Sequence, residues 1–257
     1  MSPSLALPGV SAVPESSPPS TAAVLVIGDE VLSGRTKDTN SGYIADYLTE
    51  IGIDLKEIRV VADDGDAIVN AVNALRASWT YVFTTGGIGP THDDITADSI
   101  AKAFGVGIDV DPRAVAMLRE RFPNPADLNE GRMRMTRIPF GADLIANVVS
   151  KAPGFRLGNV FVMAGVPSIM RAMMDVVGPQ LAPGVRMLSE SVRADAKEGD
   201  IATPLAAVQK AHPGVAIGSY PFMDDQGFNT NVVLRSRDAE ALAAAKAAVD
   251  EMLAGLR

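Results

Sequence analysis

The chain has 257 residues, a net charge of −8, two histidines and no cysteine, so it is long enough to bury a sizeable core in one or two domains. The negative charge argues against a nucleic-acid-binding surface, which needs clustered lysine and arginine. The absence of cysteine and the scarcity of histidine exclude thiolate and histidine-rich metal sites, so a bound metal would be a hard divalent ion with oxygen ligands, such as magnesium or manganese.

The first 21 residues are rich in serine, proline and alanine and lack both a basic start and a long apolar run. We therefore expect residues 1–21 to be a disordered tail and not a signal peptide. The sequence contains no uninterrupted run of about 18 apolar residues, so we expect no membrane span and a cytoplasmic protein.

The folded part begins with an apolar run at residues 22–27 that ends at Gly28, a pattern typical of a strand buried on both faces of a parallel sheet. Apolar spacing predicts alternating helices and strands after it: a helix containing Ile44 and Leu48, a strand at 53–61, a helix capped by Asp64, and a strand at 80–84. This alternation indicates right-handed crossovers and a mostly parallel sheet.

Helices are predicted near 96–104 and 112–122, followed by a hairpin that turns at 158–159 and a helix after Ser168. The Gly-Pro and Pro-Gly pairs at 178–184 then predict a domain boundary. We expect an α/β domain at 22–184 and a small α+β module at 185–257. The module is predicted to contain a strand at 186–194, a helix at 200–211, two strands flanking 224–227, and a final helix from Asp238.

A glycine-rich loop follows the third predicted strand and leads into a helix. Gly86, Gly87 and Gly89 let backbone N–H groups approach an anion closely, and the helix dipole adds positive potential, so phosphate is the expected ligand. The loop is not a Walker A sequence because no lysine follows it, and His92 replaces the last glycine of a dinucleotide fingerprint. The alternative is a glycine turn that only packs the strand against the helix.

Acidic residues follow three successive predicted strands. Asp29 and Glu30 follow the first, Asp63 follows the second, and Asp93 and Asp94 follow the glycine-rich loop. Helix capping is the alternative explanation for one of the last two, since aspartate often caps helices. The convergence of acids at one rim of a parallel sheet nevertheless predicts a metal-assisted phosphate site.

Two further segments offer anion ligands at the same rim. Arg35 could bind a phosphate with two hydrogen bonds, or could form a surface salt bridge. Gly165, Pro167 and Ser168 open another helix and could provide an anion-binding N-terminus, although proline and serine also begin ordinary helices.

Several of these motifs together resemble the molybdopterin-binding domain family, most closely the N-terminal part of the competence/damage-inducible protein A group. The matching segments are G-D-E-V-L-S-G-R at 28–35, D-T-N-S at 38–41, T-T-G-G-I-G-P-T-H-D-D-I-T at 84–96, A-P-G-F at 152–155 and G-V-P-S at 165–168. The resemblance implies a three-layer α/β/α fold with a mostly parallel sheet, followed by the small α+β module. The group usually has Pro and Gly after Asn147, where this chain has V-V-S-K at 148–151.

The resemblance also implies an activity. It points to a molybdopterin-binding-like protein that binds a phosphorylated nucleotide or pterin and hydrolyses a phosphoanhydride with a divalent magnesium, manganese or cobalt ion, as an ADP-ribose or dinucleotide pyrophosphatase. The alternatives are a molybdopterin adenylyltransferase of molybdenum cofactor biosynthesis, with molybdopterin as ligand, and a non-catalytic pterin- or nucleotide-binding module. A homo-oligomer is expected. The amidohydrolase domain that the group often carries is not in this chain, so its activity is not expected.

The implied roles fall on three sets of residues. The catalytic residues would be Asp94 and Asp63, and the metal ligands would be Asp93, Asp94, Asp29 and Glu30. Phosphate and ligand contacts would come from Thr85, Gly86, Gly87, Gly89, Pro90, Thr91, Ser33, Gly34, Arg35, Gly165, Pro167 and Ser168.

Overall fold

The computed structural model describes residues 20–225 and 227–256. The tail predicted for residues 1–21 therefore lies outside the described residues, apart from Ser20 and Thr21. Thr21 is the first residue of strand β1 (Thr21–Ile27), one residue earlier than the sequence pattern predicts. No described helix is both long enough and apolar enough to cross a membrane.

A six-stranded sheet forms the centre of the first lobe, in the order β2-β1-β3-β8-β7-β6. The strands are β1, β2 (Asp54–Val61), β3 (Tyr81–Thr85), β6 (Asp143–Ile145), β7 (Gly154–Leu157) and β8 (Val160–Met163). The first four strands in the spatial order are parallel, and β7 and β6 add an antiparallel hairpin edge. The mostly parallel sheet and the hairpin turn at 158–159 are thus confirmed.

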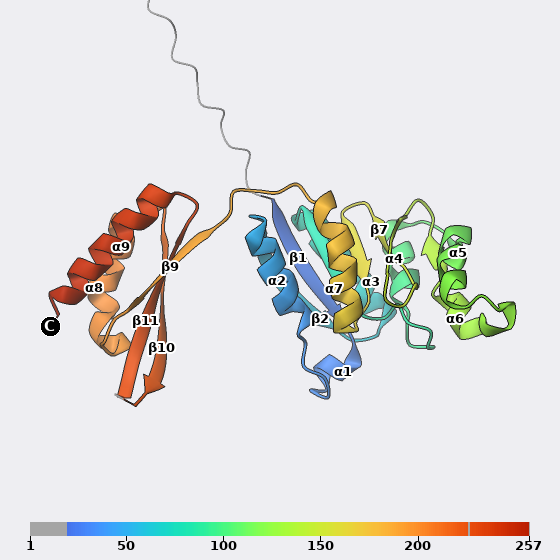
Figure 1. Cartoon of the computed structure of the whole chain (residues 1–257), viewed down its shortest axis with the longest axis horizontal. Coiled ribbons are helices and arrows are strands. Elements are labelled where there is room, and N and C mark those ends of the chain that lie inside the picture. The colour runs from blue at the N-terminus through green and yellow to red at the C-terminus, as the bar shows by residue number, and fades with distance from the viewer. Residues whose placement is uncertain (1–19, 226, 257) are drawn as a thin grey trace, which may run out of the picture.

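Helices cover both faces of this sheet (Figure 1). The helices α2 (Asn40–Glu50) and α7 (Pro167–Val177) pack on one face, and α3 (Gly65–Ser78) and α4 (Thr96–Phe104) pack on the other. Because side chains alternate along a strand, β1 supplies buried residues to both cores. Leu25 packs towards α3 and α4, whereas Val24 and Val26 pack towards α2 and α7. The expected three-layer α/β/α architecture is confirmed.

Beyond α4, the chain forms a small subdomain that contains four elements absent from the sequence prediction. It consists of β4 (Ile108–Val110), α5 (Pro112–Arg121), η1 (Pro125–Asp127), α6 (Glu130–Arg134) and β5 (Arg137–Pro139). Strands β4 and β5 pair antiparallel with each other and not with the main sheet. Only α5 was predicted, because the other elements are too short to show a hydrophobic period.

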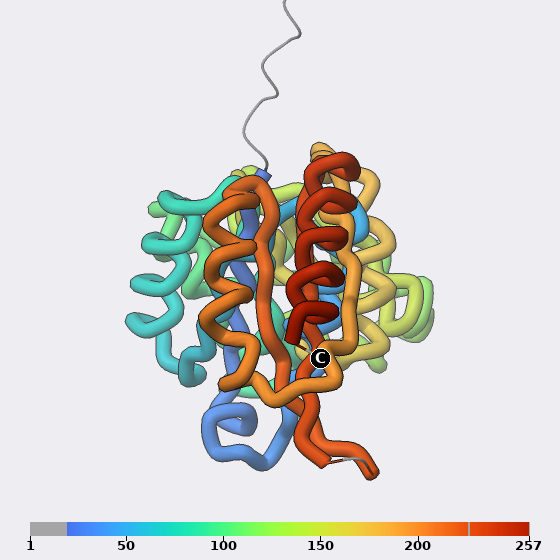
Figure 2. Tube along the Cα trace, turned by 90° about the vertical axis from the view of Figure 1, so that its left-hand side faces the viewer, coloured from blue at the N-terminus to red at the C-terminus, as the bar shows by residue number. Residues whose placement is uncertain are grey.

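The second lobe is a small α+β module, as expected. It contains β9 (Leu188–Arg193), α8 (Glu198–Ala211), β10 (Ala216–Asp224), β11 (Gly227–Ser236) and α9 (Ala239–Ala254). The strands form an antiparallel sheet in the order β10-β11-β9, and α8 and α9 lie side by side over it (Figure 2). Their core includes Ile201, Val232 and Val249.

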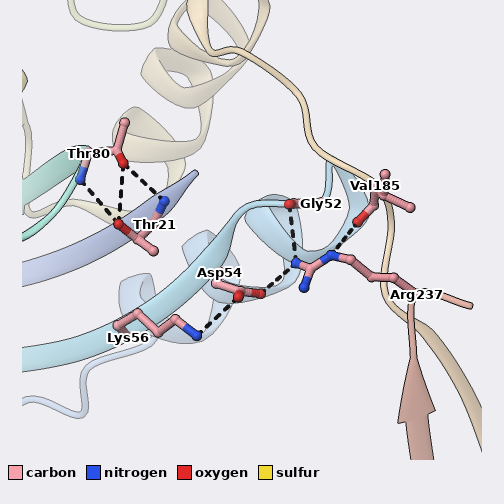
Figure 3. A network of polar contacts seen from close by, with 7 residues as sticks. All are labelled: Thr21, Gly52, Asp54, Lys56, Thr80, Val185 and Arg237. Carbon is pink, nitrogen blue, oxygen red and sulfur yellow. Dashed lines mark hydrogen bonds and ion pairs between the residues drawn. The ribbon is translucent and has the colours of Figure 1, made fainter. Parts of the chain in front are cut away.

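Segment 182–187 connects the two lobes and follows η2 (Gly178–Gln180). From the second lobe, Arg237 contacts this segment and the first lobe (Figure 3). Its guanidinium donates to the backbone oxygen of Val185 at 2.8 Å and to Asp54 Oδ1 at 2.7 Å. Burial alone would raise the pKa of Asp54, but the hydrogen bonds from Arg237 and Lys56 lower it below its ordinary value. This half-buried ion pair therefore holds the module against the edge strand β2.

Candidate functional site

The glycine-rich loop lies between the carboxyl ends of β1 and β8 and the start of α4. Gly86 has a φ of 104°, and a Cβ there would lie 2.1 Å from the backbone oxygen of Ile27. Gly87 has a φ of 65°, and a Cβ there would lie 2.2 Å from Thr96 Oγ1. Packing therefore requires glycine at both positions, as the structural alternative for this loop proposes.

Packing does not account for the polar groups of the loop. The backbone N–H groups of Gly87, Ile88 and Gly89 donate to no acceptor in the described part of the chain. Ile88 anchors the loop by packing against both hydrophobic cores. Three successive free N–H groups in a fixed loop before a helix are the arrangement that binds anions.

These residues form one wall of a cleft of about 430 Å³. The segment 86–90 lines it together with Ala164, Gly165 and Val166, where β8 leads into α7. The cleft thus lies outside the carboxyl ends of parallel strands, which is where open α/β sheets bind their ligands. Its volume suits a nucleotide-sized molecule.

Asp94 lies on the cleft wall beside the glycines and is held by Thr91. Its Oδ2 accepts hydrogen bonds from the Thr91 N–H at 2.8 Å and from Thr91 Oγ1 at 2.5 Å. The helix-capping alternative is not realised, since Ile95 is the N-cap of α4 and no side chain bonds there. Asp93 points outward, with 62% of its side chain exposed.

Asp63, at the end of β2, lies close to the acids of α1 (Asp29–Leu32). Its Oδ2 accepts a hydrogen bond from the backbone N–H of Asp29 at 2.9 Å. Burial raises the pKa of Asp63, the Asp29 N–H opposes this, and the negative charges of Asp29, Glu30 and Asp93 raise the pKa further. Acids that follow the ends of β1 and β3 therefore act electrostatically on Asp63 at the end of β2. The neighbouring residue Asp64 does not belong to this acidic group. It caps α3, as predicted, and its Oδ1 accepts a hydrogen bond from the N–H of Ala67 at 2.8 Å.

The acids do not form a preassembled metal cage. Among residues 20–225 and 227–256, no group of three or more His, Cys, Asp or Glu side chains is arranged to hold a metal ion. Glu30 and Asp94 both line the cleft, but Asp29 and Asp93 do not. Such a donor set suits a magnesium-like ion, which binds one or two carboxylates and completes its shell with water and substrate phosphate. The four-carboxylate metal site stays a prediction.

A second, smaller cavity of about 60 Å³ opens beside the cleft and shares Glu30, Gly86 and Gly165 with it. Thr85, Pro167 and Asn40 also line this cavity. Asn40 is 6% exposed; its Nδ2 donates to the backbone oxygen of Gly165 at 2.7 Å, and its Oδ1 has no hydrogen-bond partner among the described residues. A buried acceptor without a partner usually binds water or a ligand.

The remaining predicted ligand residues lie outside these cavities. Ser33 donates from Oγ to the backbone oxygen of Glu30 at 3.3 Å, and neither Gly34 nor Arg35 lines the cleft or its side cavity. Ser168 is exposed in the first turn of α7. Their roles in ligand binding stay predictions.

The wall opposite the glycine loop was not predicted from the sequence. It contains Arg121 at the end of α5 and Phe122 just after it, Met135 after α6, and Asn147 and Ser150 in the loop before β7. The departure of residues 148–151 from the group's pattern was the only sequence signal near this wall. Arg121 and Phe122 come from the end of the predicted helix α5, but its approach to the cleft depends on tertiary packing and not on a local pattern.

Comparisons with known proteins match both lobes. Residues 23–183 match the family described as "Probable molybdopterin binding domain", and residues 186–256 match "FAD synthase, middle domain". A "Probable FAD synthase" of Caenorhabditis briggsae is 30% identical over 260 residues, which cover 91% of this chain and 50% of that protein. A second "Probable FAD synthase", from Caenorhabditis elegans, is 31% identical with the same coverage, so the chain spans about half the length of these relatives.

An archaeal structure also resembles the chain. It is titled "The crystal structure of the protein CinA with unknown function from Thermoplasma acidophilum", is 34% identical, and covers 63% of this chain and 98% of its own, with a TM-score of 0.60. The coverage corresponds in extent to one lobe of the present chain.

Proposed function

Because the chain belongs to the probable molybdopterin-binding domain family, we propose that its cleft binds the phosphate of a nucleotide or pterin and catalyses metal-dependent hydrolysis of a phosphoanhydride. ADP-ribose or a dinucleotide would be the substrate. The observation that carries this proposal is the row of three N–H groups without an acceptor among the described residues, at Gly87, Ile88 and Gly89, which line the cleft together with Asp94. A phosphate group is the ligand that such donors stabilise best.

In this reaction a water molecule attacks one phosphorus, the bridging P–O bond breaks, and ADP-ribose yields AMP and ribose 5-phosphate. The loop N–H groups would hold the phosphate oxygens while charge develops on them. Asp63 would accept the proton of the attacking water, because its raised pKa makes it a stronger base than an ordinary carboxylate. Glu30 and Asp94 would hold a divalent cation, which supplies charge neutralisation when bound.

The test is incubation of the purified protein with ADP-ribose and magnesium, manganese or cobalt, with AMP release followed by chromatography. Asp94→Asn is expected to lower the rate about 100-fold or more. Asp66→Asn is the matched control, because Asp66 is an exposed acid that pairs with Lys102 on α3 and α4. The absence of AMP release by the wild-type protein, or full release by Asp94→Asn, excludes this function.

Adenylyl transfer is the second candidate, favoured by the match of residues 186–256 to the middle domain of FAD synthase and by the names of the two Caenorhabditis relatives. The acceptor would be FMN, or molybdopterin in a cofactor-synthesis role. Formation of FAD and pyrophosphate from ATP and FMN would support it. Tight binding of a nucleotide that is recovered unchanged would instead support a non-catalytic module.

The likeness to the archaeal CinA structure also supports placing this chain with the competence/damage-inducible protein A group.

We propose a boundary between residues 184 and 185, supported by the separate cores of the two lobes. We also keep the proposal of a homo-oligomer, to be tested by light scattering.

A further inference from the structure

Phe122 occupies an unusual position for a half-buried aromatic residue. It lines the 430 Å³ cleft, yet it belongs to none of the hydrophobic clusters formed by the described residues. A ring that is not needed for the core, but that faces a ligand-sized cleft, is available for recognition.

Two arginine side chains of the small subdomain contact the Phe122 ring. The Arg132 guanidinium carbon lies 4.0 Å from the ring centroid, and that of Arg121 lies 5.9 Å from it. Arg132 also donates to the backbone oxygen of Asp127, so its guanidinium is held in place over the ring. The hydrogen bonds of both arginines go to backbone oxygens, and neither has a carboxylate partner in the described part of the chain, so both leave positive charge near the cleft.

The ring is also fixed relative to the rest of the cleft. Arg121 donates to the backbone oxygen of Val149 at 2.7 Å, and Lys151 pairs with Glu120 at 2.7 Å. These two contacts tie the end of α5 to the loop before β7, whose residues Asn147 and Ser150 line the same cleft. Phe122 is therefore preorganised on the wall that faces the glycine loop.

We propose that Phe122 is a specificity-determining residue, on which the planar heteroaromatic ring of the ligand stacks while its phosphate lies on the glycine loop. This inference rests on the proposed function and adds the recognition of the ring. The remaining lining fits such a ligand, since Pro90, Met135, Val166 and Ile169 present apolar surface to the same cleft. Positive charge from the two arginines favours an electron-rich ring that carries phosphate.

The experiment measures the affinities of AMP, FMN and ribose 5-phosphate by isothermal titration calorimetry for the wild-type protein and for Phe122→Leu. We expect Phe122→Leu to weaken AMP or FMN about 10-fold, as loss of one stacking contact does, and to change ribose 5-phosphate less than about twofold. Phe122→Trp is expected to retain the affinity for the ring-bearing ligands.

Phe104→Leu is the matched control, because the Arg76 guanidinium lies 4.1 Å from the Phe104 ring in the same kind of contact, but Phe104 packs against the core and does not line the cleft. It should leave all three affinities within about twofold of the wild-type values. Equal weakening of AMP and ribose 5-phosphate by Phe122→Leu, or no weakening at all, would overturn the inference while leaving the proposed function standing. Failure of the wild-type protein to bind any of the three ligands would overturn the proposed function itself, and the inference with it.

Discussion

The backbone N–H of Asp29 donates a 2.9 Å hydrogen bond to Oδ2 of Asp63 and so ties together the carboxyl ends of the parallel strands β1 and β2. This bond holds the Asp63 carboxylate among other negative charges, where burial raises its pKa. The arrangement is unfavourable for the fold at neutral pH, which is typical of carboxylates that are kept for binding or catalysis.

Asp63→Asn is therefore expected to stabilise the fold at neutral pH while it removes activity. Below the unfolded pKa of about 3.9 the wild-type carboxyl is protonated in both states and carries no penalty. As the pH rises through the raised folded pKa, only the wild-type protein loses stability. The difference in Tm between the variant and the wild type should be small at pH 3.5 to 4 and grow towards pH 7.

Asp238→Asn is a suitable control for this titration, because Asp238 caps α9 through its hydrogen bonds to the N–H groups of Glu240 and Ala241, far from the acidic rim. It should show no such pH-dependent gain. A Tm difference for Asp63→Asn that shrinks as the pH rises would contradict the electrostatic explanation. Thermal unfolding followed by circular dichroism across this pH range gives the answer.

Gly86→Ala is expected to destabilise the first lobe by about 3 kcal/mol. The new methyl group would collide with the backbone of Ile27, and the alanine would have to adopt a positive φ that is unfavourable for residues with a Cβ. Gly34→Ala provides the comparison, since Gly34 also has a positive φ of 73° but a Cβ there meets nothing within 4 Å. It should cost only about 1 kcal/mol. Urea denaturation measures both, and equal costs would show that the close packing at Gly86 is not limiting.

Thr91→Val removes the hydroxyl that donates to Asp94 at 2.5 Å while the backbone hydrogen bond remains. We expect a loss of about 1 kcal/mol in stability and a lower kcat with the proposed substrate, because Asp94 becomes less well oriented. Thr91→Ser keeps the hydroxyl and should behave like the wild-type protein. Wild-type kcat in Thr91→Val would show that this contact does not position Asp94.

Arg237→Ala should release the second lobe from the first, since it removes the hydrogen bonds to Val185 and Asp54. We expect limited proteolysis of the connecting segment 182–187 to become about fivefold faster or more. Glu50→Ala is the control, because it removes the exposed Arg186–Glu50 pair, which contributes little, and leaves the sequence of segment 182–187 unchanged. Unchanged proteolysis in Arg237→Ala would mean that other contacts fix the lobes.

The sequence was sufficient for the layered architecture because long amphipathic helices and continuous apolar strands carry a strong period. Three residues that the sequence predicts in the site, Gly86, Gly87 and Asp94, line the cleft, since residues after parallel strands share one edge of the sheet. It could not locate Phe122 or Arg121, because their approach to the cleft depends on tertiary packing of the short elements between α4 and β7. Arg35 shows the reverse case, because it follows a strand in sequence but lines neither the cleft nor its side cavity.

The most direct test of the phosphate cradle is an NMR titration of the ¹⁵N-labelled protein with AMP, with the backbone amide resonances assigned. The amide protons of Gly87, Ile88 and Gly89 have no acceptor among the described residues and should show the largest downfield shifts as they donate to the phosphate. Saturable shifts at these three amides would support the account. Shifts confined to other parts of the molecule, with these amides unmoved at saturating AMP, would contradict it.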